Sequence, residues 1–256
     1  RDQWVNFPGA PTTDMFSIHS SFWDTKIGVG LLVTNDRIGI HNDFGTYGSF
    51  AYRIKMKPGT LSMGLQAGFN YIATDFTKLD LKDPLDDLLQ GQVSAMNPNF
   101  GAGLYYVTTD NRTYLGLSVP YILNSEFIGS ESVLSEAKRY RYYYAYGGTT
   151  FRASENIKLK PTLLVRMQAG APLTFDIGFG AVFYDVMKIG TNYRLNDNIA
   201  FILDMALIEQ LHIGYSYEYT LSEINQYSAG THEIMINFRF KSERLHGKGV
   251  QCPAYY

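Results

Sequence analysis

The chain has 256 residues, a formal net charge of −2 and only 18% charged residues, with 20 Tyr, 16 Phe and 24 Gly. This length fits one large domain or two small ones, and the charge gives no electrostatic reason to expect a nucleic-acid partner. Cys252 is the only cysteine, which excludes a disulfide within the chain. No run approaches the ~20 apolar residues of a membrane-spanning helix, but a closed barrel of strands is another way to cross a bilayer. Residues 1–11, RDQWVNFPGAP, lack the pattern of a signal peptide, so we expect that one was removed or that the sequence begins inside the mature protein.

Apolar and polar residues alternate with period two from end to end, which predicts strands. In LTFDIGFGAVFY, for example, Phe175, Ile177 and Phe179 alternate with Asp176 and two glycines. The predicted strands are 14–22, 26–34, 46–57, 60–73, 98–108, 112–121, 140–153, 157–168, 172–184, 186–195, 199–208, 211–219 and 231–240. Residues 1–5 have the pattern of the end of one more strand whose beginning is missing. The total of about 14 is even, as in single-chain bacterial barrels.

The predicted connections alternate in length. Short turns fall at 23–25, 57–59, 109–111, 154–156, around Asp185 and at 209–210, and the intervening connections include 6–13, 35–45, 74–97, 122–139 and 220–230. Two connections on the long side, near 169–171 and 196–198, are short exceptions. Tight turns at one rim and longer loops at the other are typical of outer-membrane barrels, whose tight turns are periplasmic. We therefore expect a barrel over residues 1–240 and a periplasmic tail over 241–256.

A soluble β-sandwich would also show alternating strands, but three features favour a membrane barrel. Several strands alternate for 11–12 residues, near the ~9–11 that cross a bilayer and longer than the usual ~5–6. Glycine is frequent on the polar faces, where it suits a crowded interior. Tyr and Phe gather near strand ends, like an aromatic girdle. The sequence thus predicts an all-β, transmembrane, antiparallel up-and-down β-barrel, with Phe175, Ile177 and Phe179 toward lipid and Asp176 in the lumen.

Patterns that would indicate catalysis or metal binding are weak. The five histidines, His19, His41, His212, His232 and His246, have no metal-ligand spacing. His19 lies near Ser17 and Ser21, which leaves a lipid-facing Ser–His phospholipase open, although nothing in the sequence ties these groups together. The acidic run with Asp80, Asp83, Asp86 and Asp87 matches no calcium loop. The charged residues on predicted lumen faces are interpreted as an interior polar network rather than a selectivity ring: Arg166, Asp176, Lys188, Asp204, Glu218 and Arg239.

Several stretches together resemble one known family. They are RDQWVNFPGAPTT, LSMGLQAGFNY, NPNFGAGLYY, LGLSVPYIL, RYYYAYGG, LKPTLLVRMQAGAPLTFDIG and YSAGTHEIMINFRF, in this order along nearly the whole chain. This order is similar to that of the PorP/SprF family of type IX secretion membrane proteins. The positions that carry the resemblance are Trp4, Pro8, Gly9, Ala10, Pro11, Asn99, Gly101, Gly103, His232 and Glu233.

The resemblance implies a bacterial outer-membrane barrel of Bacteroidota, with no catalytic activity and no cofactor. It also implies partners: the C-terminal signal domain of a large secreted surface protein, the type IX translocon with its periplasmic ring components, and outer-membrane lipid. We expect loops 74–97 and 122–139 to contact the secreted protein and assist its export or anchoring, with Phe76, Leu79, Phe127 and Tyr140 as candidate contact residues. The alternative is an outer-membrane channel or transporter for small or hydrophobic solutes.

Overall fold

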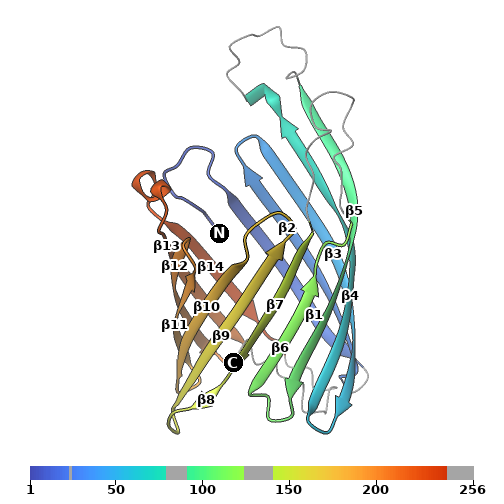
Figure 1. Cartoon of the computed structure of the whole chain (residues 1–256), viewed down its shortest axis with the longest axis vertical. Coiled ribbons are helices and arrows are strands. Elements are labelled where there is room, and N and C mark those ends of the chain that lie inside the picture. Colours follow the sequence, from blue (N-terminus) through green and yellow to red (C-terminus); the bar gives the residue numbers. More distant parts are fainter. Residues whose placement is uncertain (23–24, 79–90, 124–140, 241–256) are drawn as a thin grey trace.

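The structure is a single antiparallel sheet whose strands follow one another in chain order and curve around a lumen (Figure 1). The computed structural model describes residues 1–22, 25–78, 91–123 and 141–240. The strands are β1 (Thr12–Phe22), β2 (Ile27–Ile38), β3 (His41–Met56), β4 (Gly59–Asp75), β5 (Gln92–Thr108), β6 (Thr113–Val119), β7 (Tyr142–Thr149), β8 (Phe151–Arg152), β9 (Ile157–Gln168), β10 (Thr174–Phe183), β11 (Met187–Arg194), β12 (Asn198–Ile208), β13 (Leu211–Thr220) and β14 (Thr231–Phe238). The two-residue β8 continues the line of β7 and pairs with β9. The prediction of an all-β, up-and-down antiparallel fold of about 14 strands is confirmed.

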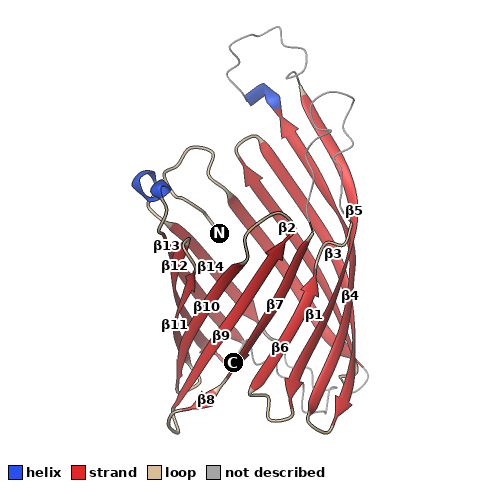
Figure 2. Cartoon of the chain, viewed as in Figure 1, coloured by secondary structure: helices blue, strands red, loops and turns tan. Residues whose placement is uncertain are grey.

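Helical structure is limited to short turns at one rim. Two 3-10 helices, η1 (Phe76–Lys78) and η3 (Glu223–Tyr227), lie above the strands in the described residues (Figure 2). None of the helices in this part of the chain is long and apolar enough to span a membrane.

The predicted sorting of the connections is observed, with two corrections. The first concerns the predicted connection 74–97, which is shorter, because β4 ends at Asp75 and β5 already begins at Gln92. We call the end that carries residues 57–58, 109–112, 153–156, 184–186 and 209–210 the tight-turn rim, and the opposite end the long-loop rim. The predicted long connection 35–45 is wrong, because β2 and β3 continue to a two-residue turn at Gly39 and Ile40. Polar residues interrupt the alternation there: Arg37 forms an ion pair with Asp14 of β1, with 3.5 Å between Nη2 and Oδ2. β2 and β3 therefore extend beyond the apolar alternating residues, whose limits had been used to predict the strand ends.

The tight turns have local chemical causes. Tyr184 and Asp185 both have positive φ, and the Val186 amide donates to the Phe183 carbonyl at 3.0 Å, as in the type I′ turns that match strand twist. At another turn, the Asp110 carboxylate accepts from the Thr108 hydroxyl at 2.6 Å and from the Arg112 amide at 3.1 Å. These hydrogen bonds favour the ionised form, so the pKa of Asp110 lies below its usual value.

The two faces of the sheet differ as predicted. On β10, Phe175, Ile177 and Phe179 point outward and are exposed, whereas Asp176 faces the lumen and is 4% exposed. On other strands Leu65 and Ile234 are likewise outward, at 66% and 72% exposure. Rows of Phe, Leu and Ile in a sandwich would be covered by a second sheet, but all described strands belong to one sheet. The sandwich alternative is therefore excluded, and the outward surface is an apolar band of the kind that lipid covers.

Lumen glycines make room for aromatic rings from neighbouring strands. Tyr146 of β7 lies against Gly116 of β6, where an added Cβ would come within 2.3 Å of the ring. Tyr114 lies against Gly148 in the same way, with the hydroxyl 2.7 Å from the position of an added Cβ. Tyr114 and Tyr146 also contact each other, with 6.4 Å between ring centroids. These glycines are thus part of the interior packing, as their frequency on the polar faces indicated.

We predict that Gly116→Ala destabilises the barrel, because the new methyl group would displace the Tyr146 ring. The expected cost is about 1–3 kcal/mol, typical of overpacking. The matched control is Gly64→Ala, also on the lumen face, where an added Cβ would meet only carbonyl oxygens at 3.8 and 3.9 Å. Urea unfolding in detergent micelles measures both. Equal stability of the two variants would contradict the packing role.

Candidate functional site

The amino-terminal motif joins separate strands at the long-loop rim. Arg1–Val5 lies between β1 and β14, which do not pair directly with each other in the described residues. The Asp2 amide donates to the His232 carbonyl at 2.8 Å, and the His232 amide donates to the Asp2 carbonyl at 2.9 Å. On the other side, the Thr13 amide donates to the Arg1 carbonyl at 2.8 Å. The expected extra strand at 1–5 is therefore present as a short bridge, at the position where a closing strand would lie.

The turn that follows this bridge holds the next hairpin. Trp4 has a φ of 46° and its amide donates to the Thr231 hydroxyl at 3.3 Å. Gly9 has a φ of 73°, which favours glycine, and its carbonyl accepts from the Gly39 amide at 3.0 Å. An added Cβ at Gly9 would lie 3.4 Å from the Gly39 Cα. The segment that contains Trp4, Pro8, Gly9, Ala10 and Pro11 thus ties β14 to the turn between β2 and β3.

Glu233 and His232 lie on opposite faces of β14. Glu233 faces the lumen, where its Oε2 lies 3.9 Å from Arg1 Nε; Arg1 Nη2 also lies 3.3 Å from Glu218 Oε2. His232 faces outward, and its Nδ1 lies 2.7 Å from the Tyr215 hydroxyl. The structure therefore brings the amino-terminal motif and the His232–Glu233 pair together, although more than 200 residues separate them in the sequence.

A second cluster on β5 anchors the segment that follows β6. Asn99 is 1% exposed, and its side chain forms two hydrogen bonds with the Leu123 backbone. Asn99 Nδ2 donates to the Leu123 carbonyl at 3.0 Å, and the Leu123 amide donates to Asn99 Oδ1 at 3.1 Å. Gly101 permits this approach, since an added Cβ would come within 2.6 Å of the Pro120 carbonyl oxygen. Gly103 is less crowded, with 3.2 Å to the Leu117 carbonyl. Residues 120–123 are thereby fixed on the lumen side of β5.

Other groups extend this anchor. The ring of Tyr121 packs edge-on against Tyr47 of β3, with 5.7 Å between centroids. Arg141, at the start of the returning segment, donates from Nε and Nη2 to the Ile122 carbonyl at 2.9 and 2.6 Å. Tyr47, Tyr121 and Arg141 were not identified from the sequence. The high Tyr content was the only available signal, because the contacts join β3 to the segments after β6 and before β7, which are far apart in the sequence.

The lumen contains the expected charge network. Asp176 of β10 accepts from Arg194 Nε at 2.9 Å and lies 3.3 Å from Arg166 Nη2; Arg194 Nη1 also reaches Asp197 at 3.1 Å. His212 Nδ1 lies 3.4 Å from Asp204. Asp176, Arg166 and Asp204 were predicted from the sequence to face the lumen; Arg194, which was not predicted, continues the network to β11. A balanced network of this kind ties neighbouring strands across the lumen face.

Three of the four candidate contact residues, Leu79, Phe127 and Tyr140, lie outside the described residues. Phe76 is described and is 6% exposed, at the start of η1, where its amide donates to the Gly91 carbonyl at 3.0 Å. Its side chain is buried next to the end of β4, and a contact surface farther along this connection stays a prediction. The tail 241–256 and the acidic run at 80–87 also lie outside the described residues.

The four histidines in the described part of the chain, His19, His41, His212 and His232, do not form a shared site. His19 shares the lumen face with Ser49 and Gly30, so it does not face lipid as a phospholipase of the proposed kind requires. His232 faces outward, but its hydrogen-bond partner is a tyrosine. Among the described residues there is also no group of three or more His, Cys, Asp or Glu side chains that could hold a metal ion.

Residues 1–238 match the family model described as Type IX secretion system membrane protein PorP/SprF. The chain belongs to this family. No curated protein matches the chain. As a PorP/SprF member it is a membrane component of a type IX secretion system, in agreement with the exposed apolar face of its sheet. The match covers all the described strands, the amino-terminal bridge and the Asn99 anchor.

We predict that Asn99→Ala releases the segment at 120–123, because the Leu123 amide and carbonyl both lose their hydrogen-bond partner. A loss of about 1–3 kcal/mol is expected for the removal of two hydrogen bonds. Asn97→Ala is the control: Asn97 lies two residues away on the same face, and its Nδ2 has no hydrogen-bond partner among the described residues. Limited proteolysis of residues 120–141 should become faster only in Asn99→Ala. Equal cleavage of both variants would contradict the anchoring role.

Proposed function

We propose that this PorP/SprF protein is an outer-membrane barrel of the type IX secretion and gliding machinery. It binds the C-terminal signal domain of a large secreted surface protein and assists export of that protein or its anchoring at the cell surface. In this proposal the tight-turn rim and the tail 241–256 are periplasmic, within reach of the translocon and its periplasmic ring. The long-loop rim faces outward and contacts the secreted protein.

The observation that carries the proposal is a wall of long strands on one side of the long-loop rim (Figure 1). β3, β4 and β5 have 16, 17 and 17 residues, whereas about 9–11 residues suffice to cross a bilayer. The surplus of roughly six residues corresponds to about 20 Å of strand. A barrel that only needed to span the membrane would not require this wall, which is suited to holding a partner above the surface.

Among the described residues, the wall ends in a strand edge that has no partner strand. β6 pairs with β5 only between Ala102 and Val107, and the Ile122 amide adds one bond to the Phe100 carbonyl. Above that point, none of the described residues pairs with the side of β5 that faces away from β4. Backbone groups of a strand point alternately to its two sides, so those of Met96 and Ser94 point to the same free side as the Phe100 carbonyl.

A free edge of this kind is a template for an added strand. Pro98 lacks an amide hydrogen and lies on the free side, so it limits uncontrolled pairing along the edge. The segment above it, residues 92–97, remains long enough to accept one strand of a β-rich domain. Pairing along loop edges would give affinity through the backbone, and side chains of the loops at 76–91 and 120–141 would then supply selectivity.

The interactions on the lumen face favour the proposed binding function over a function as a solute channel. Residues 120–123 lie on the lumen side of β5, and Asp176 joins arginines of two neighbouring strands. A lumen lined by paired charges and partly covered by residues 120–123 is a poor route for solutes, and planar-bilayer conductance of the purified barrel is expected to be absent or small. A large steady conductance would favour the channel alternative.

Met96→Pro tests the edge directly. The substitution removes one amide hydrogen on the free side and leaves the hydrogen bonds with β4 in place, because this residue points away from them. We expect it to abolish retention of the secreted protein at the cell surface in cells that carry only the variant. Met96→Thr is the control, since it changes the same outward side chain and keeps the backbone donor. Both variants should assemble, as judged by heat-dependent electrophoretic mobility. Normal surface display with assembled Met96→Pro would overturn pairing at this edge.

A further inference from the structure

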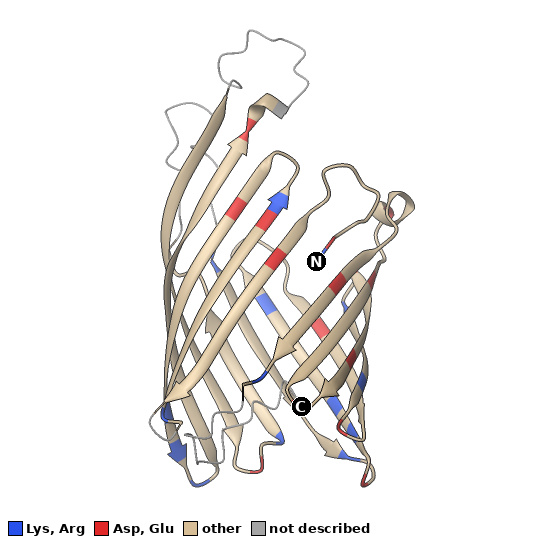
Figure 3. Cartoon of the chain, turned by 180° about the vertical axis from the view of Figure 1, so that it is seen from behind, with Lys and Arg blue, Asp and Glu red and all other residues tan. Residues whose placement is uncertain are grey.

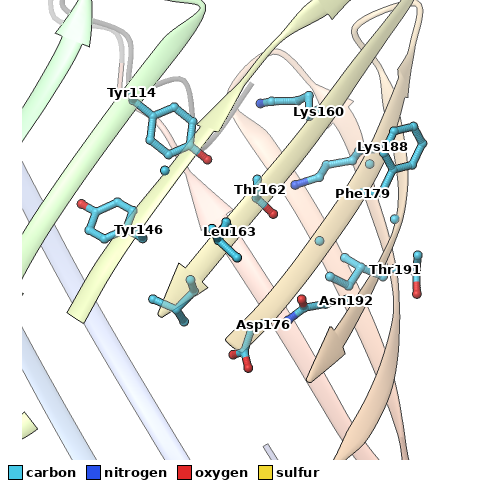
Figure 4. Close-up of a pocket in the computed structure, with 16 residues that line it drawn as sticks. Tyr114, Tyr146, Lys160, Thr162, Leu163, Asp176, Phe179, Lys188, Thr191 and Asn192 are labelled. Carbon is cyan, nitrogen blue, oxygen red and sulfur yellow. The ribbon is translucent and has the colours of Figure 1, made fainter. Parts of the chain in front are cut away.

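Two cavities of the described sheet lie on opposite faces. The cavity in Figure 4 is on the lumen face, where it is lined by Lys160, Asp176 and Lys188 of three adjacent strands. Lys188 crosses over Gly180, where an added Cβ would lie 3.3 Å from the lysine Cε. The other cavity is on the outward face, over β3 to β6, and has a volume of about 520 Å³. This volume is within the range of small-ligand sites, so the face that lipid covers also contains a hollow.

The strand register explains this outward hollow, which we call the Ala102 groove. Its walls are large outward side chains of four strands: Phe50, Leu65, Leu104, Leu117 and Val119. Ala102 of β5 lies between Leu65 and Val119 in one row across the sheet. In the neighbouring row, Leu104 lies between Met63 and Leu117 and fills the corresponding position. The groove is therefore the space that one small residue leaves among large ones.

The surroundings of the groove are apolar. Its walls are exposed on the outward surface, with Leu65 at 66% and Leu117 at 49% exposure. β5 and β6 contain no Lys, Arg, Asp or Glu, and the single charged residue of β4 is Asp75 at its end (Figure 3). The groove is continuous with the apolar band that contacts lipid, and an empty hollow there would lose van der Waals contacts. An acyl chain restores those contacts, because it is apolar and flexible.

Polar groups lie at the long-loop end of the groove. Tyr144 is opposite Ser118 in the register, so Tyr143 comes next to Val119 on the outward face, where it is 39% exposed. Tyr142 pairs with the last residue of β9, so this end of β7 is at the long-loop rim.

Arg141 is held beside Tyr143 at this rim. Its Nη1 lies 3.5 Å from the Tyr143 hydroxyl. The Ile122 carbonyl fixes the guanidinium group, because Nε and Nη2 donate to it at 2.9 and 2.6 Å. The groove thus ends in an arginine and a tyrosine whose positions are set by the backbone.

These groups match the headgroup of a lipid. Arginine recognises phosphate through a fixed set of N–H donors, and tyrosine is typical of the membrane–water interface. An apolar groove that ends in these two residues at the rim has the same order of chemistry as a phospholipid, in which acyl chains lead to a phosphate. Continuity with the lipid-facing surface and this charge complementarity identify the occupant.

We propose that the Ala102 groove and Arg141 form a binding site for one phospholipid molecule. One acyl chain lies over Ala102 between Leu65 and Val119, and the phosphate accepts hydrogen bonds from Arg141 and the Tyr143 hydroxyl. The lipid lies on the outward side of β5, on the tight-turn side of the segment 92–97. The site rests on contact between the barrel and lipid, and it does not depend on binding of the secreted protein.

Native mass spectrometry of the purified full chain in an uncharged detergent tests the site. The probe is dipalmitoyl phosphatidylglycerol, and the reference is dipalmitoylglycerol, which has the same chains and no phosphate. We expect saturable retention of one phosphatidylglycerol molecule, with higher affinity than for the reference. Ala102→Phe should weaken this binding roughly tenfold or more, because the ring takes the place of the acyl chain. The matched control is Ala181→Phe, at an outward alanine of β10 between Leu159 and Ile189, which should leave binding unchanged.

The headgroup contact has its own variants. Arg141→Gln should weaken binding of phosphatidylglycerol severalfold and leave binding of dipalmitoylglycerol unchanged. Arg141→Lys keeps the positive charge and should retain most of the affinity. Equal affinity of the two lipids for the unmodified protein, or unchanged phosphatidylglycerol binding in Arg141→Gln, would overturn the proposal.

The groove itself has further outcomes. Absence of saturable retention by the folded protein overturns the proposal, as does equal weakening in Ala102→Phe and Ala181→Phe. A lipid-free dimer that Ala102→Phe disrupts would identify a second copy of the chain as the occupant and would also overturn it. If Ala102→Phe does not assemble, as judged by heat-dependent electrophoretic mobility, Leu117→Ala removes one wall and should still reduce the affinity severalfold. Unchanged affinity in Leu117→Ala would then overturn the site.

Discussion

The structure depends on the need to pair every backbone polar group that is surrounded by lipid. An unpaired amide or carbonyl in hydrocarbon costs several kcal/mol, so strands that cross a membrane must form a continuous hydrogen-bonded sheet. Period-two alternation then follows, because each strand has one face toward lipid and one toward the lumen. In this protein the rule is visible in β10, where phenylalanines and Ile177 face outward and Asp176 faces inward. The same requirement gives the bridge at Arg1–Val5 its importance, since it lies between the two strands that do not pair directly.

Glycines on the lumen face determine how the interior packs as much as the larger residues do. Glycines on the inward face accept the rings of Tyr114 and Tyr146, permit the close approach of Pro120 to Gly101, and form the floor beneath Lys188. In each case a cross-strand neighbour fills the space. As a result, tyrosine rings pack together on the lumen face of β5 to β7, and the Asp176 network lies on the lumen face of β9 to β11. Tyr47 and Tyr121 help to fix the base of an outer connection, and the Asp176 network joins β9, β10 and β11.

The sequence alone predicts the features that depend on local alternation. The fold class, the outward face of β10, the positions of most strands and the tight turn at Asp185 could all be predicted, because each depends on residues within one hairpin. The turn at Gly39 and Ile40 was missed, because polar residues such as Arg37 end the apolar pattern before the strand ends. The Asn99–Leu123 anchor and the positions of Lys160 and Lys188 on either side of β10 depend on the register between strands. No local pattern in a single sequence encodes that register. The meeting of the amino-terminal motif with His232 could not be predicted from spacing for the same reason.

The central claim is that the apolar face of each strand contacts acyl chains and the polar face encloses a lumen. Spin labels at two adjacent positions of β4 test it, with Cys252→Ser as the background: Leu65→Cys on the outward face and Gln66→Cys on the inward face. Collision rates with oxygen and with a water-soluble nickel chelate are measured in reconstituted bilayers. The account predicts that the Leu65 label collides mainly with oxygen and the Gln66 label is shielded from lipid. The reverse pattern, or nickel access to the Leu65 label equal to that in bulk water, would contradict it.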